Sequence, residues 1–231
     1  MSSIECRNCG TSLPGGAAYC PDCGQSVKEY SRPWLEMARE LLVEALDFDG
    51  RMFRSIRVLF TRPGFLSLEY INGKRATYTS PVRMYLIISL LFFLVLPLIL
   101  TPAEFVSSDH KFSVDLYSKG MFVLLPAFAL LLKLFYRPFF YMDHLVFSIH
   151  LFSASYVVFA AILSIEVLAD QYLLVALVQV VFLLFMVWYA IFALHLVYGD
   201  SWPKSVLKFL GLMLLFLPAL GALIEAASHV S

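Results

Sequence analysis

Five long apolar stretches constrain the fold of this chain more than any other feature of its sequence. Each is close to the length of about 20 residues that a helix needs to cross the hydrocarbon layer of a membrane. Charged residues make up only 15% of the 231 residues, whereas soluble domains contain about a quarter. The sequence therefore predicts an all-α integral membrane protein with about five transmembrane helices. The predicted spans are residues 82–100, 116–136, 144–166, 172–198 and 205–227.

The second stretch is the weakest of the five, because Lys133 lies near its end. A lysine at the end of a span can extend its ammonium group to the interface, so five spans are the preferred prediction. The alternative is four spans, with residues 116–136 entering and leaving the membrane on the same side.

The basic residues of the short connections predict the orientation of the bundle. They gather before the first span, between the second and third, and between the fourth and fifth. Of the other two connections, one holds Lys111 and Lys119 and the other holds none. Because cytoplasmic loops carry an excess of Lys and Arg, we expect a cytoplasmic N-terminus and an outside C-terminus. The residues on the predicted cytoplasmic side are Lys74, Arg75, Arg83, Lys133, Arg137, Lys204 and Lys208.

All four cysteines fall in two C-x-x-C pairs near the N-terminus, in the stretches CRNCG and CPDCG. Two such pairs are typical of a zinc ribbon, in which four thiolates bind one tetrahedral ion. Disulfides or unused thiols are the alternatives, but disulfides need an oxidising compartment. Residues 1–28 are therefore predicted to form a ribbon whose folding depends on a structural Zn²⁺. The predicted ligands are Cys6, Cys9, Cys20 and Cys23.

The partner of this ribbon is predicted from its charge. Ribbons that bind nucleic acid need a basic surface, and here Arg7 and Lys28 are nearly the only positive residues. The composition therefore argues against nucleic acid and favours a cytoplasmic protein partner or a structural cap.

Residues 29–80 are predicted to hold amphipathic membrane-surface helices and a linker, ahead of the transmembrane bundle at residues 81–231. One helix is expected at 34–48 and a second at 51–62, ended by Pro63-Gly64. Arginines of the second helix share one side, where they could contact lipid phosphates. Alternatively, this helix packs on the bundle with a solvated basic face. The candidate phosphate contacts are Arg51, Arg54, Arg57, Lys74 and Arg75.

Polar residues gather at the cytoplasmic end of the predicted bundle. They could cap the third span and hydrogen-bond between helices, line a pocket open to the cytoplasm, or bind a metal or haem through the histidines. A helix places Asp143 and His150 on one face, because they are seven residues apart. The candidate pocket residues are Arg137, Asp143, His144, His150, His195 and Tyr198.

Several of these stretches together resemble a bacterial membrane family, domain of unknown function 3667. They are the two CxxCG knuckles, the segment LFTRPGFLSLEYINGKRATYTSPVRMYLIISLLFF, the stretch DHLVFSIH from Asp143, and VYGDS from Val197. The resemblance implies a cytoplasmic zinc ribbon on a multi-pass protein of the bacterial inner membrane, and it carries no activity.

No hydrolase, zinc-protease or phosphate-loop motif occurs in the sequence. We therefore expect a non-enzymatic scaffold that binds membrane lipids or a protein partner. The alternative is a small transporter, channel or lipid-handling protein that uses the polar pocket.

Overall fold

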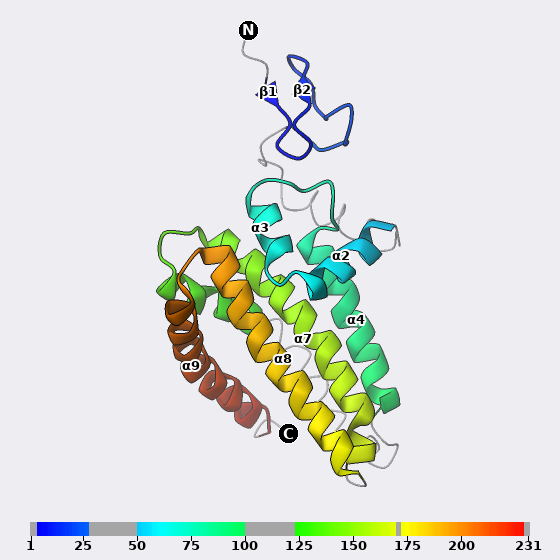
Figure 1. The fold of residues 1–231 in the computed structure, drawn as a ribbon, viewed down its shortest axis with the longest axis vertical. Helices are drawn as coiled ribbons and strands as arrows, with labels where there is room; N and C mark the ends of the chain where they lie inside the picture. Colours follow the sequence, from blue (N-terminus) through cyan, green and yellow to red (C-terminus); the bar gives the residue numbers. More distant parts are fainter. Residues whose placement is uncertain (1–3, 28–49, 100–122, 170–171, 229–231) are drawn as a thin grey trace.

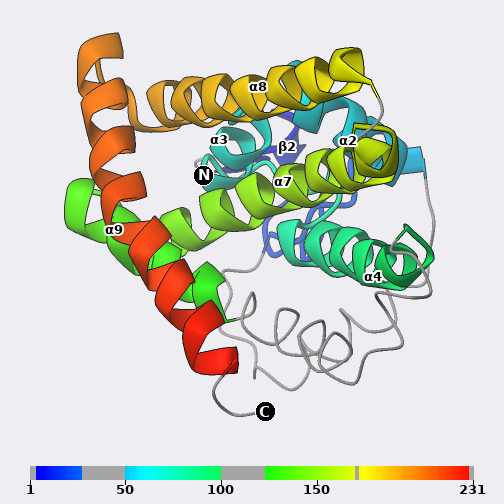
Figure 2. The same ribbon diagram turned by 90° about the horizontal axis from the view of Figure 1, so that it is seen from below.

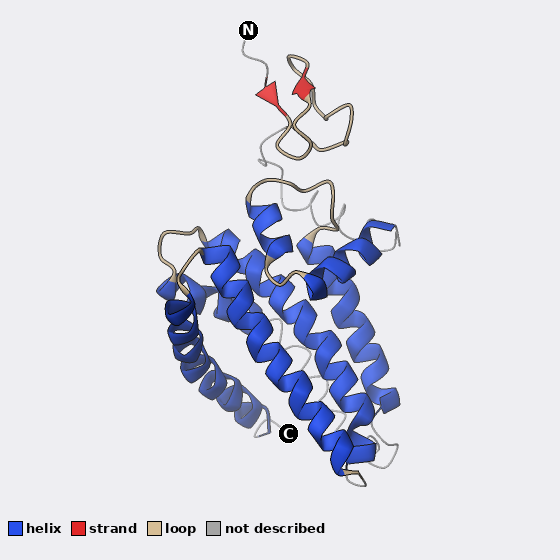
Figure 3. Cartoon of the chain, in the orientation of Figure 1, coloured by secondary structure: helices blue, strands red, loops and turns tan. Residues whose placement is uncertain are grey.

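The computed structural model describes residues 4–27, 50–99, 123–169 and 172–228 (Figure 1). A small two-stranded unit stands at one end of a helical bundle, which we call the ribbon end (Figure 3). The strands are β1 (Ile4–Glu5) and β2 (Ser12–Leu13). The labelled helices are α2 (Gly50–Thr61), α3 (Phe65–Ile71), α4 (Pro81–Ile99), α7 (Tyr141–Ala169), α8 (Leu173–Tyr198) and α9 (Trp202–Ser228), and a further helix covers Val123–Phe135.

The ribbon is built from two similar cysteine turns joined by a short antiparallel pair. Ile4 pairs with Leu13 in that ladder, and a second bridge joins Tyr19 to Ser26. Each C-x-x-C turn ends on a glycine with positive φ, 80° at Gly10 and 71° at Gly24. Glycine adopts this conformation without steric cost, which explains why both pairs are followed by it.

Helices α4, α7 and α8 lie side by side and form the body of the molecule (Figures 1 and 2). α2 and α3 cross their ribbon end, so the core continues from the bundle into these two short helices. Met52 and Leu59 of α2 and Leu66 of α3 pack with the side chains of the long helices. Periodicity predicts an apolar side of this helix made of Met52, Phe53, Ile56, Leu59 and Phe60. The structure packs four of them against the bundle, whereas Phe53 is 70% exposed, which corrects its assignment to that side.

A second core joins the helix Val123–Phe135 to α9 and to the end of α8. α9 runs at an angle to α8 rather than along it (Figure 2). Gly211 allows α9 to approach the helix Val123–Phe135 closely, because a Cβ at this position would lie 2.9 Å from the ring of Phe135. Tyr198, one of the predicted pocket residues, belongs to this core.

Three of the described helices are long and apolar enough to cross a membrane, within Tyr141–Ile165, Leu173–Tyr198 and Trp202–Ala222. Many leucines and valines of α8 and α9 are exposed, as expected of helices that face lipid. The described apolar parts of the first two predicted spans are shorter, Pro81–Leu96 and Val123–Phe135. Five spans therefore stay a prediction, and the surface helix expected at 34–48 lies outside the described residues.

Candidate functional site

The four cysteine sulfurs of the ribbon form one compact group. Their Sγ atoms all lie within 4.8 Å of one another, with Cys6 and Cys23 3.6 Å apart and Cys9 and Cys20 3.5 Å apart. Four thiolates at about 2.3 Å from a tetrahedral ion lie about 3.8 Å from each other. A disulfide would need about 2.05 Å, and all four cysteines are free. The group could therefore hold one metal ion.

The two outer thiols of this group differ in acidity. Hydrogen bonds to the side chain and backbone of Thr11 lower the pKa of the exposed Cys9 thiol to about 6. Desolvation raises the pKa of the Cys23 thiol to about 11. Metal binding at neutral pH would therefore release a proton from Cys23, because thiolates are the ligands.

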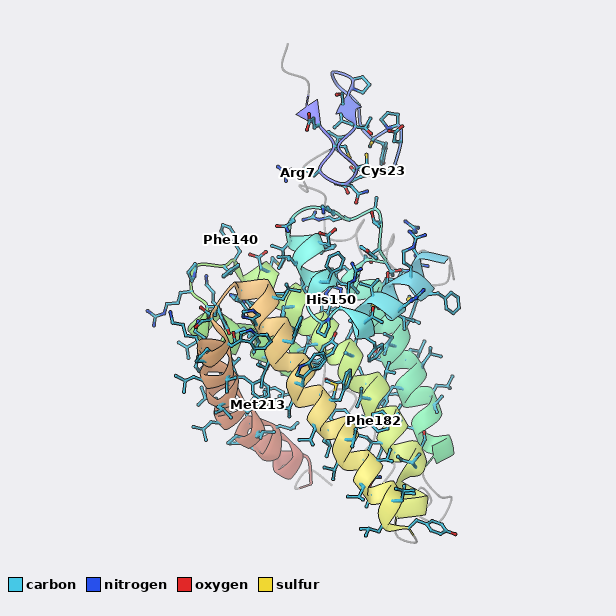
Figure 4. All side chains as sticks on the ribbon, in the orientation of Figure 1. Arg7, Cys23, Phe140, His150, Phe182 and Met213 are labelled. Carbon is cyan, nitrogen blue, oxygen red and sulfur yellow. The ribbon has the colours of Figure 1, made fainter. Side chains whose placement is uncertain are left out.

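The ribbon is fastened to the loop that follows α3. The amide group of Gln25 donates to the carbonyl of Gly73 at 2.8 Å and accepts from the backbone N–H of Arg75 at 3.0 Å. The hydroxyl of Thr77 donates to Oδ1 of Asn8 at 3.1 Å. Arg7 and Cys23 lie on the side of the ribbon that faces the bundle (Figure 4). Sequence reasoning missed Asn8, Gln25 and Thr77, because only the folded chain brings them together.

The segment that carries this loop is itself held on the long helices. Tyr189 of α8 donates to the carbonyl of Leu59, at the end of α2, at 2.8 Å. Gly64, between α2 and α3, packs on Ala193 so closely that a Cβ would lie 2.9 Å from the Ala193 carbonyl oxygen. Specific contacts thus join the ribbon to the segment of α2 and α3, and that segment to the bundle.

His150 belongs to the same set of contacts. Its Nδ1 lies 2.9 Å from the hydroxyl of Ser67 on α3, and both side chains are buried. Figure 4 shows His150 inside the bundle, near its ribbon end. His150, a polar residue inside a long apolar helix, therefore has a side-chain partner on the short helix α3.

Asp143 and His144 contact the start of α7 and the end of α8. Oδ2 of Asp143 accepts from the backbone N–H of Phe140 at 3.0 Å, one turn earlier, which closes the helix start. Nδ1 of His144 lies 2.7 Å from the hydroxyl of Tyr198. Tyr136 stacks on Tyr198 with ring centroids 3.8 Å apart. Aromatic rings thus pack tightly around His144.

His195 has a third environment, in the connection between α8 and α9. Its Nδ1 hydrogen-bonds to the carbonyl of Asp200, and its ring stacks on Trp202 at 4.3 Å. Lys208 forms an ion pair with Asp200 at 2.6 Å and lies over the ring of Tyr136 at 3.9 Å. Arg137 is exposed between the helix Val123–Phe135 and α7.

The predicted pocket residues are therefore divided among different partners. Within the described part of the chain, the four cysteines are the one group of three or more ligand residues placed to hold a metal ion. The three histidines hydrogen-bond separately to Ser67, Tyr198 and Asp200, and the geometry gives no support to a shared metal or haem site.

The predicted phosphate contacts fall into two groups. Arg51, Arg54 and Arg57 are exposed on α2, opposite its buried side, and Phe53 beside them is 70% exposed. Lys74 instead pairs with Glu69 at 2.9 Å, and the guanidinium of Arg75 lies 4.8 Å from the ring centroid of Tyr70.

Between the ribbon and α2 lies a cleft of about 730 Å³. Its charged lining is mostly basic, with Arg7, Arg51 and Arg75 against Glu5. The cleft thus brings Arg7 of the ribbon and Arg51 of α2 into one lining.

The fold and the site together define a class: a helical protein with three helices long and apolar enough to cross a membrane, and a four-cysteine module held at one end of the bundle. Residues 49–93 match the model of the family described as protein of unknown function (DUF3667), which confirms the resemblance over this segment. The match covers α2, α3, most of α4 and the loop that holds the ribbon, while both cysteine pairs and the stretch 143–150 lie outside it. No curated protein and no solved structure matches the chain.

Proposed function

We propose that this protein is a non-enzymatic scaffold of the bacterial inner membrane that binds anionic lipid at its cytoplasmic surface and presents a zinc ribbon there. The observation that carries the proposal is the arrangement of α2. Its apolar side packs on the bundle, and its three arginines and Phe53 are exposed at the ribbon end. Basic and aromatic side chains on one surface helix are typical of contact with phosphates and acyl chains.

The ribbon adds a protein-binding element to this surface. Zn²⁺ is the natural occupant of four cysteines in two C-x-x-C turns, and the hydrogen bonds of Gln25 keep the ribbon at a defined place above α2. A fixed position matters for recruitment, because a partner on the ribbon would then lie directly over the lipid surface.

The transport alternative has less support in the geometry. Tyr198 stacks on Tyr136 and hydrogen-bonds to His144, and His150 hydrogen-bonds to Ser67 of α3. Side chains that fill the space between helices in this way stabilise a bundle rather than open a path through it.

Lipid selectivity tests the proposal. The full chain is reconstituted in vesicles, and the association of spin-labelled phosphatidylglycerol is compared with that of spin-labelled phosphatidylcholine. Each basic residue near an anionic surface contributes about 1 kcal/mol, or about 3 kcal/mol for the three arginines together. Replacing Arg51, Arg54 and Arg57 by Gln should therefore reduce the preference for the anionic lipid by roughly a hundredfold. The matched variant with three Arg→Lys changes should keep most of it. An unchanged preference in the Gln variant would contradict the proposal.

Partner recruitment is tested separately. Affinity capture from membranes is compared between the native chain and a Cys6→Ser, Cys23→Ser variant that lacks half of the metal ligands. A partner lost specifically from the variant supports the recruiting role, and an identical set of captured proteins contradicts it.

A further inference from the structure

The first turn of α4 holds an unusual concentration of unpaired polar atoms. Among the described residues, seven buried side-chain nitrogen or oxygen atoms have no hydrogen-bond partner. Four of them belong to this one turn: Oγ1 of Thr79, Oγ of Ser80, and Nε and Nη2 of Arg83. Buried polar groups in folded proteins are nearly always hydrogen-bonded, so such a cluster needs an explanation.

Arg83 is the one charged residue among these three, and its side chain is buried. Its side chain is 3% exposed, and a guanidinium group stays charged at every physiological pH. A buried charge that lacks hydrogen bonds is unfavourable, and neither Nε nor Nη2 of Arg83 has a hydrogen-bond partner. An anion with acceptor oxygens would satisfy both the charge and the two nitrogens.

Hydrogen bonds of the backbone fix the start of α4. The backbone N–H of Thr79 donates to the buried hydroxyl of Ser55 on α2 at 2.9 Å, which holds the entry to the helix. The first helical bond runs from the N–H of Met84 to the carbonyl of Ser80 at 3.0 Å. Ser80 is thus the N-cap, yet its hydroxyl makes no capping bond.

Arg83 lies in the same turn, three residues after the N-cap. Side chains on a helix lean toward its N-terminus, and this tendency favours an approach of the Arg83 guanidinium to the turn that holds Ser80 and Thr79. The N-terminus of a helix also carries a partial positive charge that favours anions. A guanidinium group, two hydroxyls and a helix N-terminus thus belong to one turn, and the polar side-chain atoms among them are buried without partners.

We propose that the first turn of α4 binds a phosphate group, with Arg83 donating two hydrogen bonds and Thr79 and Ser80 supplying their hydroxyls. Phosphate suits this set because it offers several acceptor oxygens and pairs with arginine through two parallel bonds. The site lies inside the ribbon end and is independent of the lipid contact proposed for the exposed face of α2. The phosphate is carried by a phospholipid headgroup or occurs as a free anion, and the two sources share this chemistry.

The test uses the full chain, purified in detergent and extensively delipidated. For the lipid source, tightly bound phospholipid is extracted with organic solvent and counted by phosphorus analysis and native mass spectrometry. For the free-anion source, the delipidated protein is titrated with inorganic phosphate. The native chain should retain about one phospholipid or bind one phosphate, and Arg83→Gln should lose the lipid or bind phosphate at least about tenfold more weakly.

Three further variants keep the result decisive. Arg62→Gln removes an exposed arginine of the same segment and should leave binding unchanged. If Arg83→Gln fails to fold, the double variant Thr79→Val, Ser80→Ala keeps the charge and should still weaken binding. Arg83→Lys should bind more weakly than the native chain, because lysine lacks the fork. Absence of bound phosphate of either kind in the native chain, or equal binding by native chain and Arg83→Gln, overturns the proposal.

Discussion

His150 of α7 and Ser67 of α3 form a hydrogen bond of 2.9 Å between two buried side chains. The contact joins a long apolar helix to a surface helix that precedes it by 83 positions in the sequence. Ser67 lies inside the segment that matches the family, and His150 lies outside it. His150, the last residue of the stretch DHLVFSIH, therefore helps to hold α3 on the bundle.

Removing one partner of this pair should destabilise the protein. Ser67→Ala leaves Nδ1 of His150 buried without a partner, which costs about 1–2 kcal/mol of unfolding free energy. Equilibrium unfolding in detergent measures the loss. Ser164→Ala is the matched control, because this exposed serine bonds only to its own helix at Ala160, and it should change stability very little. Equal effects at the two serines would show that the pair contributes nothing specific.

Gly64 should be the least replaceable glycine of the surface segment. A Cβ there would lie 2.9 Å from the carbonyl oxygen of Ala193, and φ is +79°. Gly199 has a similar φ of +69° with open space around it, so Gly199→Ala measures the conformational cost alone, about 1 kcal/mol. Gly64→Ala should lose at least about 2 kcal/mol, since the steric clash adds to that cost. Thermal unfolding of both variants provides the comparison, and equal losses would rule out the close packing on α8.

Gln25 should position the ribbon without affecting its metal. Gln25→Ala removes both hydrogen bonds to the loop at Gly73 and Arg75 and leaves the four cysteines intact. Hydrogen exchange of the Arg75 amide should accelerate, while the zinc content stays at about one per chain. An amide that exchanges as slowly as in the native chain would contradict the observed docking.

Metal removal should unfold the ribbon and spare the bundle. The buried apolar group of the ribbon consists of little more than Cys6, Leu13 and Cys20, so the ion would supply most of its folding free energy. Treatment with a strong chelator should make all four cysteines reactive to alkylation while the helical circular dichroism is retained. Cysteines that stay protected without metal would argue against a metal-dependent ribbon.

The sequence predicts where helices begin and end more readily than which segments they contact. Pro63-Gly64 and Ser80-Pro81 are local signals, and the structure ends α2 at Thr61 and begins α4 at Pro81. The role of Asp143 at the start of α7 was also accessible, because its partner Phe140 is only three residues away. Apolar periodicity and turn residues act over short distances, so they can be read from the chain directly.

Contacts between distant segments could not be derived in this way. Gln25 and Gly73 are 48 positions apart, and no pattern in either stretch points to the other. Arg83 counted only as one more basic residue beside a span, because its burial depends on how α4 packs. Grouping the histidines by depth was reasonable for isolated helices, but the packing of α3 and of the α8–α9 connection gave each histidine a different partner.

The most direct test of the proposed function is whether the exposed face of α2 contacts lipid. With the three native tryptophans replaced by phenylalanine, Phe53→Trp places a fluorophore on that face, and Tyr19→Trp places one on the exposed surface of the ribbon. In vesicles that contain lipids brominated near the headgroup end of their acyl chains, fluorescence at position 53 should be strongly quenched and fluorescence at position 19 should not. Quenching at neither position would show that α2 faces water, and it would contradict a lipid-binding role for this helix.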